Sequence, residues 1–265
     1  GRVGCSHLGV GRSGAADRPS HTLANRLVGN DESAATIESC GGLTLRLHRA
    51  AVVAVTGARG AIDVRHGAPM AVNGVQHQPA GTELTLRSPD EGMRYYLAVR
   101  GGFDVDPVLG SRSFDTLAGL GPRLLAGALI RVGPDPRTPI TTDLGIRLPR
   151  TTLVHLSEGP RRDWFTAEAW TTLTTTGFVV SPSGNRVGAR LSGAVLERVA
   201  VRELLSEGLV EGAIQVPPDG QPIVMLADHP VTGGYPVIAV VAAHHLSLVV
   251  QARPGTVLRF RHAIG

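Results

Sequence analysis

Glycine and proline divide this 265-residue chain into short segments, and their spacing limits the possible folds more than any other feature. The chain holds 34 glycines and 18 prolines, spread along its length. The apolar, β-branched runs between them are as long as typical strands and too short for most helices. These runs are Val52–Val55, Thr82–Leu86, Tyr95–Val99, Gly177–Val180, Ile223–Leu226, Pro236–Val241, Leu246–Val250 and Val257–Phe260. The pattern predicts a mainly β protein, built as a sandwich or barrel.

Helices are expected in two places only. The first is Pro19–Val28, where Asp17 can cap the amino end and a proline suits the first turn. Its buried side is predicted to consist of Leu23, Leu27 and Val28. The second, shorter helix is expected over Arg161–Trp170.

The stretch Gly133–Pro149 is rich in proline, threonine and glycine and lacks apolar periodicity, so it is the natural linker. It divides the chain into an N-terminal β-barrel-like unit, residues 1–145, and a C-terminal β-barrel-like unit, residues 146–265. No sequence repeat relates the two.

The charged residues exclude several kinds of chemistry. All 26 basic residues are arginine, so no lysine can form a Schiff base, serve in a phosphate-binding loop or carry biotin. The net charge is +4, but the arginines are scattered and aromatic residues make up only 4%; nucleic-acid binding is therefore not expected. Cys5 and Cys40 are the only cysteines, and two free thiols suit a reducing cytoplasm. No apolar run approaches the ~20 residues of a membrane span.

Generic catalytic motifs are absent: there is no phosphate-loop, nucleophile-elbow, zinc-protease or paired-cysteine signature. The adjacent pair His244-His245 stands at the start of an expected strand, where neighbouring side chains point to opposite faces. A surface role is therefore favoured, and no metal-binding residue is predicted.

Three polar, glycine-rich loops are candidates for a binding site. Gly9–Asp17 contains Arg12 and Ser13, the second loop, Gly110–Asp115, contains Arg112, and the third, Ser181–Gly188, contains Asn185 and Arg186. Glycine allows backbone N–H groups to approach a ligand, and a fixed arginine suits a carboxylate or phosphate. The alternative is purely structural: a helix entry capped by Asp17, and hairpin loops tied by arginine to carbonyl groups.

The densest polar segment is Ser206–Pro236. Pro218-Asp219-Gly220 is a typical hairpin turn. A turn alone, however, does not require the other polar and glycine residues of the segment, so a shared polar site is favoured. Those residues are Gln215, Gln221, Asp228, Thr232, Gly233, Gly234 and Tyr235.

These segments resemble the family that contains the C-type subunit of 5-oxoprolinase, allophanate hydrolase subunit 2, the kinase-inhibitor antagonist of bacilli and part of the carboxyltransferase region of urea carboxylase. The resemblance covers essentially the whole chain. It rests on Gly9–Asp17, Ala24–Asn30, Tyr96–Gly102, Leu109–Ser113, Asn185–Leu191 and, above all, Ser206–Pro236. It implies two linked cyclophilin-like β-barrel units with few short helices. It also implies a B-type subunit, similar to allophanate hydrolase subunit 1, and an A-type 5-oxoprolinase subunit as partners.

The implied activity is that of an ATP-dependent 5-oxoprolinase subunit, which converts 5-oxoproline, ATP and water to glutamate, ADP and phosphate. ATP is expected in the complex, and covalent biotin is not. Two alternatives stay open: a carboxyltransferase subunit of the allophanate hydrolase or urea carboxylase type, and a non-catalytic antagonist of a kinase-inhibitor protein. The sequence departs from the family in lacking, before Gly1, a segment with a Gln-Asp pair, and in having Asn185 where Asp is common.

The site residues are assigned as follows. Catalytic roles are predicted for Arg186, Asp228 and Gln215, with Asp228 acting in proton transfer. Substrate binding is predicted for Arg12, Ser13, Arg112, Asn185, Gln221, Thr232, Gly233, Gly234 and Tyr235.

Overall fold

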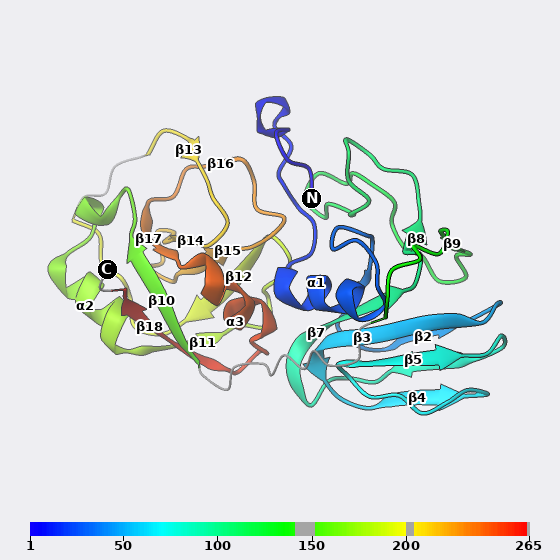
Figure 1. Cartoon of the computed structure of the whole chain (residues 1–265). Coiled ribbons are helices and arrows are strands. Elements are labelled where there is room, and N and C mark those ends of the chain that lie inside the picture. Colours follow the sequence, from blue (N-terminus) through cyan, green and yellow to red (C-terminus); the bar gives the residue numbers. More distant parts are fainter. Residues whose placement is uncertain (141–151, 200–203, 264–265) are drawn as a thin grey trace. The chain divides into compact units, whose positions relative to one another are not determined.

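The computed structural model describes residues 1–140, 152–199 and 204–263, and their elements are drawn in Figure 1. They form two compact units. The first comprises Gly1–Ala16, Val108–Gly121 and Arg150–Gly265, and the second comprises Asp17–Pro107 and Pro122–Pro149. The predicted division at residue 145 did not foresee this arrangement, because long-range contacts leave no trace in local composition. Residues 141–149 of the predicted linker lie outside the described residues.

The first unit is built around a closed barrel of seven strands. Around the barrel, the order is β10 (Leu153–Glu158), β17 (Val237–Val241), β14 (Ala213–Gln215), β15 (Ile223–Met225), β12 (Gly188–Ser192), β11 (Gly177–Val180) and β18 (Val257–His262). Neighbouring strands are antiparallel except β10 and β18, whose parallel pairing closes the barrel. Inward-facing residues such as Leu156, Phe178 and Phe260 are fully buried and form its core.

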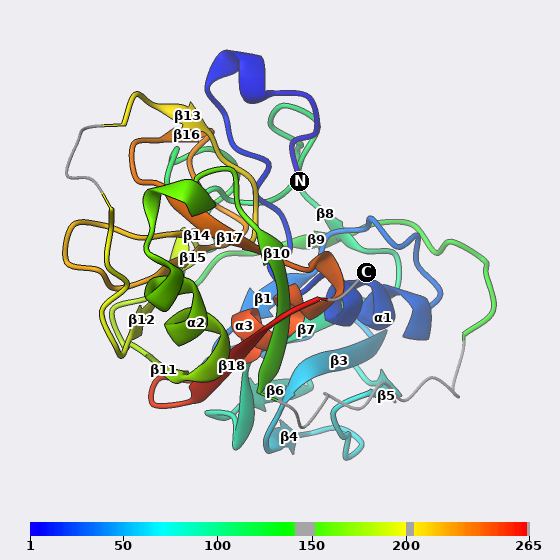
Figure 2. The same cartoon turned by 90° about the vertical axis from the view of Figure 1, so that its left-hand side faces the viewer.

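Short elements cover this barrel. The helix α2 (Ala167–Thr175) contacts β18, as Figure 2 shows, and α3 (Leu246–Gln251) follows β17. Three 3-10 turns, η1 (Ser6–Leu8), η2 (Arg162–Trp164) and η3 (Ala243–His245), belong to the same unit. The two-stranded pair β13 (Glu207–Gly208) and β16 (Thr232–Gly233) lies outside the barrel sheet.

The second unit contains two main sheets and one helix. The four-stranded sheet has the order β1 (Ile37–Ser39), β7 (Glu91–Val99), β3 (Ala51–Arg59) and β5 (Gly74–Gln78). The three-stranded sheet has the order β2 (Leu43–Arg46), β6 (Glu83–Leu86) and β4 (Ile62–Arg65), and β8 (Phe103–Asp104) pairs with β9 (Arg131–Val132). Buried residues of both main sheets, among them Val53, Leu84 and Leu97, form a second core.

The helix α1 (Arg18–Leu27) packs on β3 and β7, as Figure 1 shows, and confirms the first predicted helix. Asp17 is its N-cap and accepts a hydrogen bond from the Ser20 N–H. The Asp17 N–H in turn donates to the Tyr96 hydroxyl (2.7 Å), which donates to Glu38 (2.9 Å). Burial, followed by the nearby charges of Glu38 and Asp17, raises the pKa of Tyr96 well above its usual value, so the phenol stays protonated and keeps this link.

The prediction of a mainly β fold with few short helices is confirmed. Of the two predicted barrel units, the described residues show a closed barrel in the first unit, and the second unit consists of separate sheets. Two local predictions were wrong. Leu246–Val250 forms α3 and not a strand, because a short apolar run that is buried nearly all round has no periodicity to separate the two. The second helix starts later than predicted, at Ala167, where the Thr166 side chain caps it, and it extends to Thr175. Within residues 1–140, 152–199 and 204–263, no helix has the length and apolar character that crossing a membrane requires.

Candidate functional site

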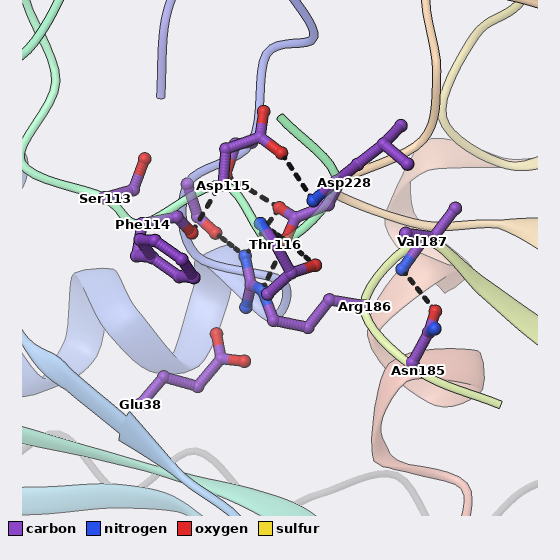
Figure 3. A network of polar contacts seen from close by, with 12 residues as sticks. Glu38, Ser113, Phe114, Asp115, Thr116, Asn185, Arg186, Val187 and Asp228 are labelled. Carbon is purple, nitrogen blue, oxygen red and sulfur yellow. Dashed lines mark hydrogen bonds and ion pairs between the residues drawn. The ribbon is translucent and has the colours of Figure 1, made fainter. Parts of the chain in front are cut away.

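A buried carboxylate, that of Asp228, is the centre of the polar contacts in the first unit (Figure 3). Strand pairing explains its position. Gly188 on β12 lies opposite Met225 on β15, and the pairing continues beyond both strands. The Leu226 N–H donates to the Val187 carbonyl (2.9 Å), and the Asp228 N–H donates to the Arg186 carbonyl (3.0 Å). The side chains of Arg186 and Asp228 therefore emerge from paired backbone.

Arg186 binds this carboxylate with two parallel hydrogen bonds. Its Nε donates to Oδ2 and its Nη2 donates to Oδ1, both at 3.0 Å. The side chain of Asp228 is fully buried and that of Arg186 is 20% exposed. Such a bidentate pair fixes the guanidinium in one plane, which a lysine cannot do.

Two hydroxyl residues from distant loops complete the shell of Asp228. The Ser13 hydroxyl donates to Oδ1 (2.7 Å). The Thr116 hydroxyl (2.7 Å) and the Thr116 N–H (3.0 Å) both donate to Oδ2. Figure 3 shows Thr116 and Arg186 directed at the same carboxylate. Ser13 reaches it with a φ of +52°, a left-handed backbone that is unusual for a residue with a Cβ.

Asp228 thus accepts five hydrogen bonds, which saturates a carboxylate with about four lone-pair positions. Burial raises the pKa of Asp228, but the hydrogen bonds and charge of Arg186, with help from Ser13 and Thr116, outweigh burial and lower the pKa overall. The group is therefore an ionised acceptor at neutral pH. It is suited to hold other groups in place, and poorly suited to take up a proton.

The loop that carries Thr116 is itself fixed by a buried arginine. Arg2 is 1% exposed, and its guanidinium donates to the Ser113 hydroxyl (3.2 Å) and to the carbonyls of Ser113 (2.7 Å) and Leu120 (3.1 Å). Asp115 accepts from the N–H groups of Leu117 and Ala118, both at 2.9 Å. These contacts close the loop into a rigid turn that presents Thr116 to Asp228.

A second group forms around Gln215 in the same unit. Gln215 is buried, and its Nε2 donates to the Tyr235 carbonyl (2.9 Å). Gly233 lies against it: a Cβ at that position would come within 2.7 Å of both Gln215 Nε2 and a Leu209 methyl. Thr232 and Gly233 form β16, Gly234 is exposed, and Tyr235 is 45% exposed. The structure therefore joins Gln215 to the Thr232–Tyr235 segment, as a shared site requires.

The other predicted residues are exposed or bind backbone groups outside these two groups. Arg12 and Arg112 are exposed. Asn185 turns back on its own loop and accepts from the Val187 N–H (2.8 Å), as Figure 3 shows. Gln221 makes two hydrogen bonds to the backbone of Gly193, accepting at 2.8 Å and donating at 3.3 Å. The catalytic and substrate-binding roles of all these residues stay predictions.

Comparison with known proteins places the chain in a family. The family of the carboxyltransferase domain, subdomain A and B, matches residues 8–262. The chain belongs to this carboxyltransferase-domain family. The C-type subunit of the 5-oxoprolinase of Escherichia coli (strain K12) is 37% identical over 96% of this chain and 84% of its own length. The urea amidolyase of Saccharomyces cerevisiae is 30% identical over 98% of this chain, but this match covers 16% of that enzyme.

Solved structures have the same fold. The crystal structure of TTHA0988 superposes with a TM-score of 0.88 at 37% identity, over 98% of this chain and 52% of that one. The urea amidolyase of K. lactis superposes with a TM-score of 0.91 at 28% identity, over 98% of this chain and 17% of that one. This chain thus spans about half of the first and less than a fifth of the second.

Sequence reasoning found only part of the site of this carboxyltransferase-family chain. It identified Ser13, Arg186 and Asp228, which the structure brings together, and it missed Thr116 and Arg2. Thr116 directly follows the second polar loop, so extending that motif by one residue would have included it. Nothing in the sequence around Arg2 indicated that it is buried, since its burial depends on a loop more than 100 residues away.

Proposed function

We propose that this chain is the C-type subunit of an ATP-dependent 5-oxoprolinase, which opens the lactam of 5-oxoproline to give glutamate, ADP and phosphate. The observation that carries the proposal is the match to the C-type subunit of the E. coli 5-oxoprolinase, at 37% identity over 96% of this chain and 84% of that protein. The urea amidolyases match at lower identity and over only 16% of their length. Both the identity and the agreement in length favour the first reaction.

Opening the lactam requires fixed hydrogen-bond donors near the carbonyl oxygen, which gains negative charge. A lactam is a stable amide, so its carbonyl must be activated, and ATP can do this by phosphorylation. Arg186, held in one plane by Asp228, is suited to stabilise the resulting charge. In this proposal Asp228 positions Arg186 instead of moving a proton, because its carboxylate is already saturated and ionised. Gln215 positions the Thr232–Tyr235 segment, where hydroxyl and N–H groups bind the substrate.

A partner protein is the second part of the proposal. Leu205 (88% exposed) and Val210 (56%) flank β13, and Tyr235 (45%) follows its partner strand β16. Large apolar side chains gathered at one strand pair favour a protein interface. We assign this surface to a B-type subunit. An A-type subunit then makes up the rest of a cytoplasmic enzyme whose ATP site belongs to the complex.

The interface is tested by gel filtration of the purified chain with the B-type subunit. Leu205→Glu should prevent coelution, because a charge would have to be buried at the contact. Leu129→Glu is the matched control, since Leu129 is comparably exposed (80%) in the other unit. Separate elution of the unmodified proteins, or equal effects of the two variants, would contradict the assignment.

The reaction is tested by glutamate release from 5-oxoproline with all three subunits and ATP. We expect release that needs every subunit, needs ATP and is indifferent to avidin, because the proposed reaction uses no biotin. This chain itself has no lysine that could carry biotin.

Carboxyl transfer is the second candidate, favoured by the slightly higher TM-score of the urea amidolyase structure, 0.91 against 0.88. In that case turnover would depend on bicarbonate and stop on addition of avidin. Absence of glutamate release from the complete complex would rule out the 5-oxoprolinase.

A further inference from the structure

Three histidines meet on the outside of the barrel in the first unit, although only two are adjacent in sequence. His155 lies on β10 between Val154 and Leu156, which are both buried in the barrel, so its side chain faces outwards. His244 and His245 lie on η3. One ring nitrogen of each lies within 4.8 Å of those of the other two. The expected strand with its two rings on opposite faces is therefore wrong: the ring centroids of His244 and His245 are 4.3 Å apart.

Strand pairing explains this meeting. Leu156 on β10 lies opposite Val241 on β17, so the chain leaves β17 beside His155. The backbone of His155 then binds the following turn twice: its carbonyl accepts from the Ala242 N–H (2.9 Å), and its N–H donates to Nδ1 of His245 (2.7 Å). The ring centroids of His155 and His245 consequently lie 4.6 Å apart, with the ring planes tilted by 50°.

These rings have unused coordinating capacity. In residues 1–140, 152–199 and 204–263, the ring nitrogens of His155 and His244 have no hydrogen-bond partner. Nδ1 of His245 accepts a hydrogen bond from the His155 N–H (2.7 Å), so this nitrogen carries no proton. Neutral imidazole is the form that binds metals.

We propose that His155, His244 and His245 bind one divalent transition-metal ion of the zinc class. Imidazole nitrogen suits Zn²⁺, Cu²⁺ and Ni²⁺ and is a poor ligand for Mg²⁺ or Ca²⁺. Two nitrogens on a tetrahedral Zn²⁺ at about 2.0–2.1 Å are roughly 3.3 Å apart. The ring nitrogens now lie within 4.8 Å of one another, so each pair must approach by roughly 1.5 Å at most to bind the ion. Rotation of the side chains can supply this movement. Three protein ligands leave one position for water or another ligand.

Two features of the site oppose metal binding: a hydrogen bond at His245 and the positive charge of Arg261. A neutral imidazole has one lone pair, and that of His245 accepts from the His155 N–H, so His245 must release this bond to become the third ligand. A net hydrogen bond corresponds to about a tenfold factor in an equilibrium constant, which a third metal–nitrogen bond exceeds. Arg261 is the register partner of His155 on β18 and is exposed, so water screens its repulsion of the ion.

The test is calorimetric titration of the full chain, free of any affinity tag, with Zn²⁺. We expect one ion per chain. His244→Ala and His155→Gln should each weaken binding by at least about tenfold, since loss of even an outer-shell partner costs about 10–100-fold. Zn²⁺ should also raise the melting temperature of the unmodified protein, and should not raise that of His244→Ala.

Matched controls separate this site from adventitious binding. His48 is an exposed histidine of the other unit, outside the cluster, so His48→Ala should leave the affinity unchanged. Cys40 is an exposed cysteine and the obvious competing soft ligand, so Cys40→Ser should leave the affinity unchanged as well. No saturable binding, an unchanged affinity in His244→Ala, or a loss of binding in either control equal to that in His244→Ala would overturn the proposal.

Discussion

Replacing Asp228 by asparagine tests the idea that its carboxylate organises the first unit. Asparagine has nearly the same shape but no charge, and one of its two terminal groups is a donor. If the NH₂ group takes the place of Oδ1, it faces the Ser13 hydroxyl, which can rotate, and Arg186 Nη2, which cannot accept. If it takes the place of Oδ2, it faces the Thr116 N–H and Arg186 Nε, both of which are donors. Either orientation leaves Arg186 facing a donor and removes the negative charge of Asp228 beside it.

The size of the effect follows from burial. The Asp228 side chain is fully buried and that of Arg186 is 20% exposed, so this pair resembles a buried ion pair more than a surface one. Removing one partner of a buried pair typically costs about 3–5 kcal/mol, against about 0–1 kcal/mol for an exposed pair. With a typical urea m-value of about 2 kcal/mol/M, the midpoint of unfolding should fall by roughly 2 M.

Tryptophan fluorescence in urea is the appropriate assay. Both tryptophans of the chain, Trp164 and Trp170, lie in the first unit, so their signal reports the unfolding of that unit alone. Asp219→Asn is the matched control: Asp219 is exposed and accepts one N–H hydrogen bond, which an amide carbonyl can also accept, so a change within about 0.5 kcal/mol is expected. Arg186→Gln in the Asp228→Asn background should cost less than in the unmodified chain. Equal midpoints for Asp228→Asn and Asp219→Asn, or additive effects in this cycle, would refute the reasoning.

Three further predictions concern the same unit. In the folded state, the pKa of Asp228 is lowered below its unfolded value of about 3.9. Its contribution to the free energy of unfolding is therefore complete above about pH 3.9 and is lost as the pH falls through the folded pKa. Below about pH 4, acid titration of the fluorescence signal should be steeper for the unmodified chain than for Asp228→Asn. Ser13→Ala should lower the free energy of unfolding by about 1.5–3 kcal/mol, because it removes the hydrogen bond to Asp228. Ser13→Gly should lower it by about 1 kcal/mol less, since glycine adopts a φ of +52° without strain. A urea midpoint of Ser13→Gly at or below that of Ser13→Ala contradicts this. Gly233→Ala should destabilise by about 1–3 kcal/mol, because its Cβ would meet Gln215 and Leu209 at 2.7 Å, whereas Gly234→Ala, whose nearest neighbour is at 3.6 Å, should be silent in the same urea titration.

What the sequence predicted well is what local chemistry determines. The helix α1 was predictable because its cap, its proline and its apolar side lie within a dozen consecutive residues. Strand runs such as Tyr95–Val99 and Val257–Phe260 were predictable from β-branched and aromatic content between turn residues. Leu246–Val250 was not, since its side chains are buried whether the segment is a helix or a strand.

The site was less predictable because its parts come from distant segments. Ser13 and Asp228 are 215 residues apart in sequence, and Thr116 and Asp228 are 112 apart. Composition can mark each loop as unusual, but which loops meet depends on the pairing of β12 with β15 and on the course of residues 108–121. The cluster of His155 with His244 and His245 was missed for the same reason: the pairing of β10 with β17 joins a lone histidine to an adjacent pair.

The structure also changes the meaning of the glycines in the first polar loop. At sequence level, they suggested backbone N–H groups open to an anion. A Cβ at Gly11 would come within 2.8 Å of the His229 carbonyl, and Gly14 has a φ of +98°. Both glycines are therefore required by close packing and backbone conformation around the Asp228 segment, with or without a ligand. In the proposed function, the donors left to bind an anion at this loop are therefore Arg12, which is exposed, and Arg186, whose plane Asp228 fixes.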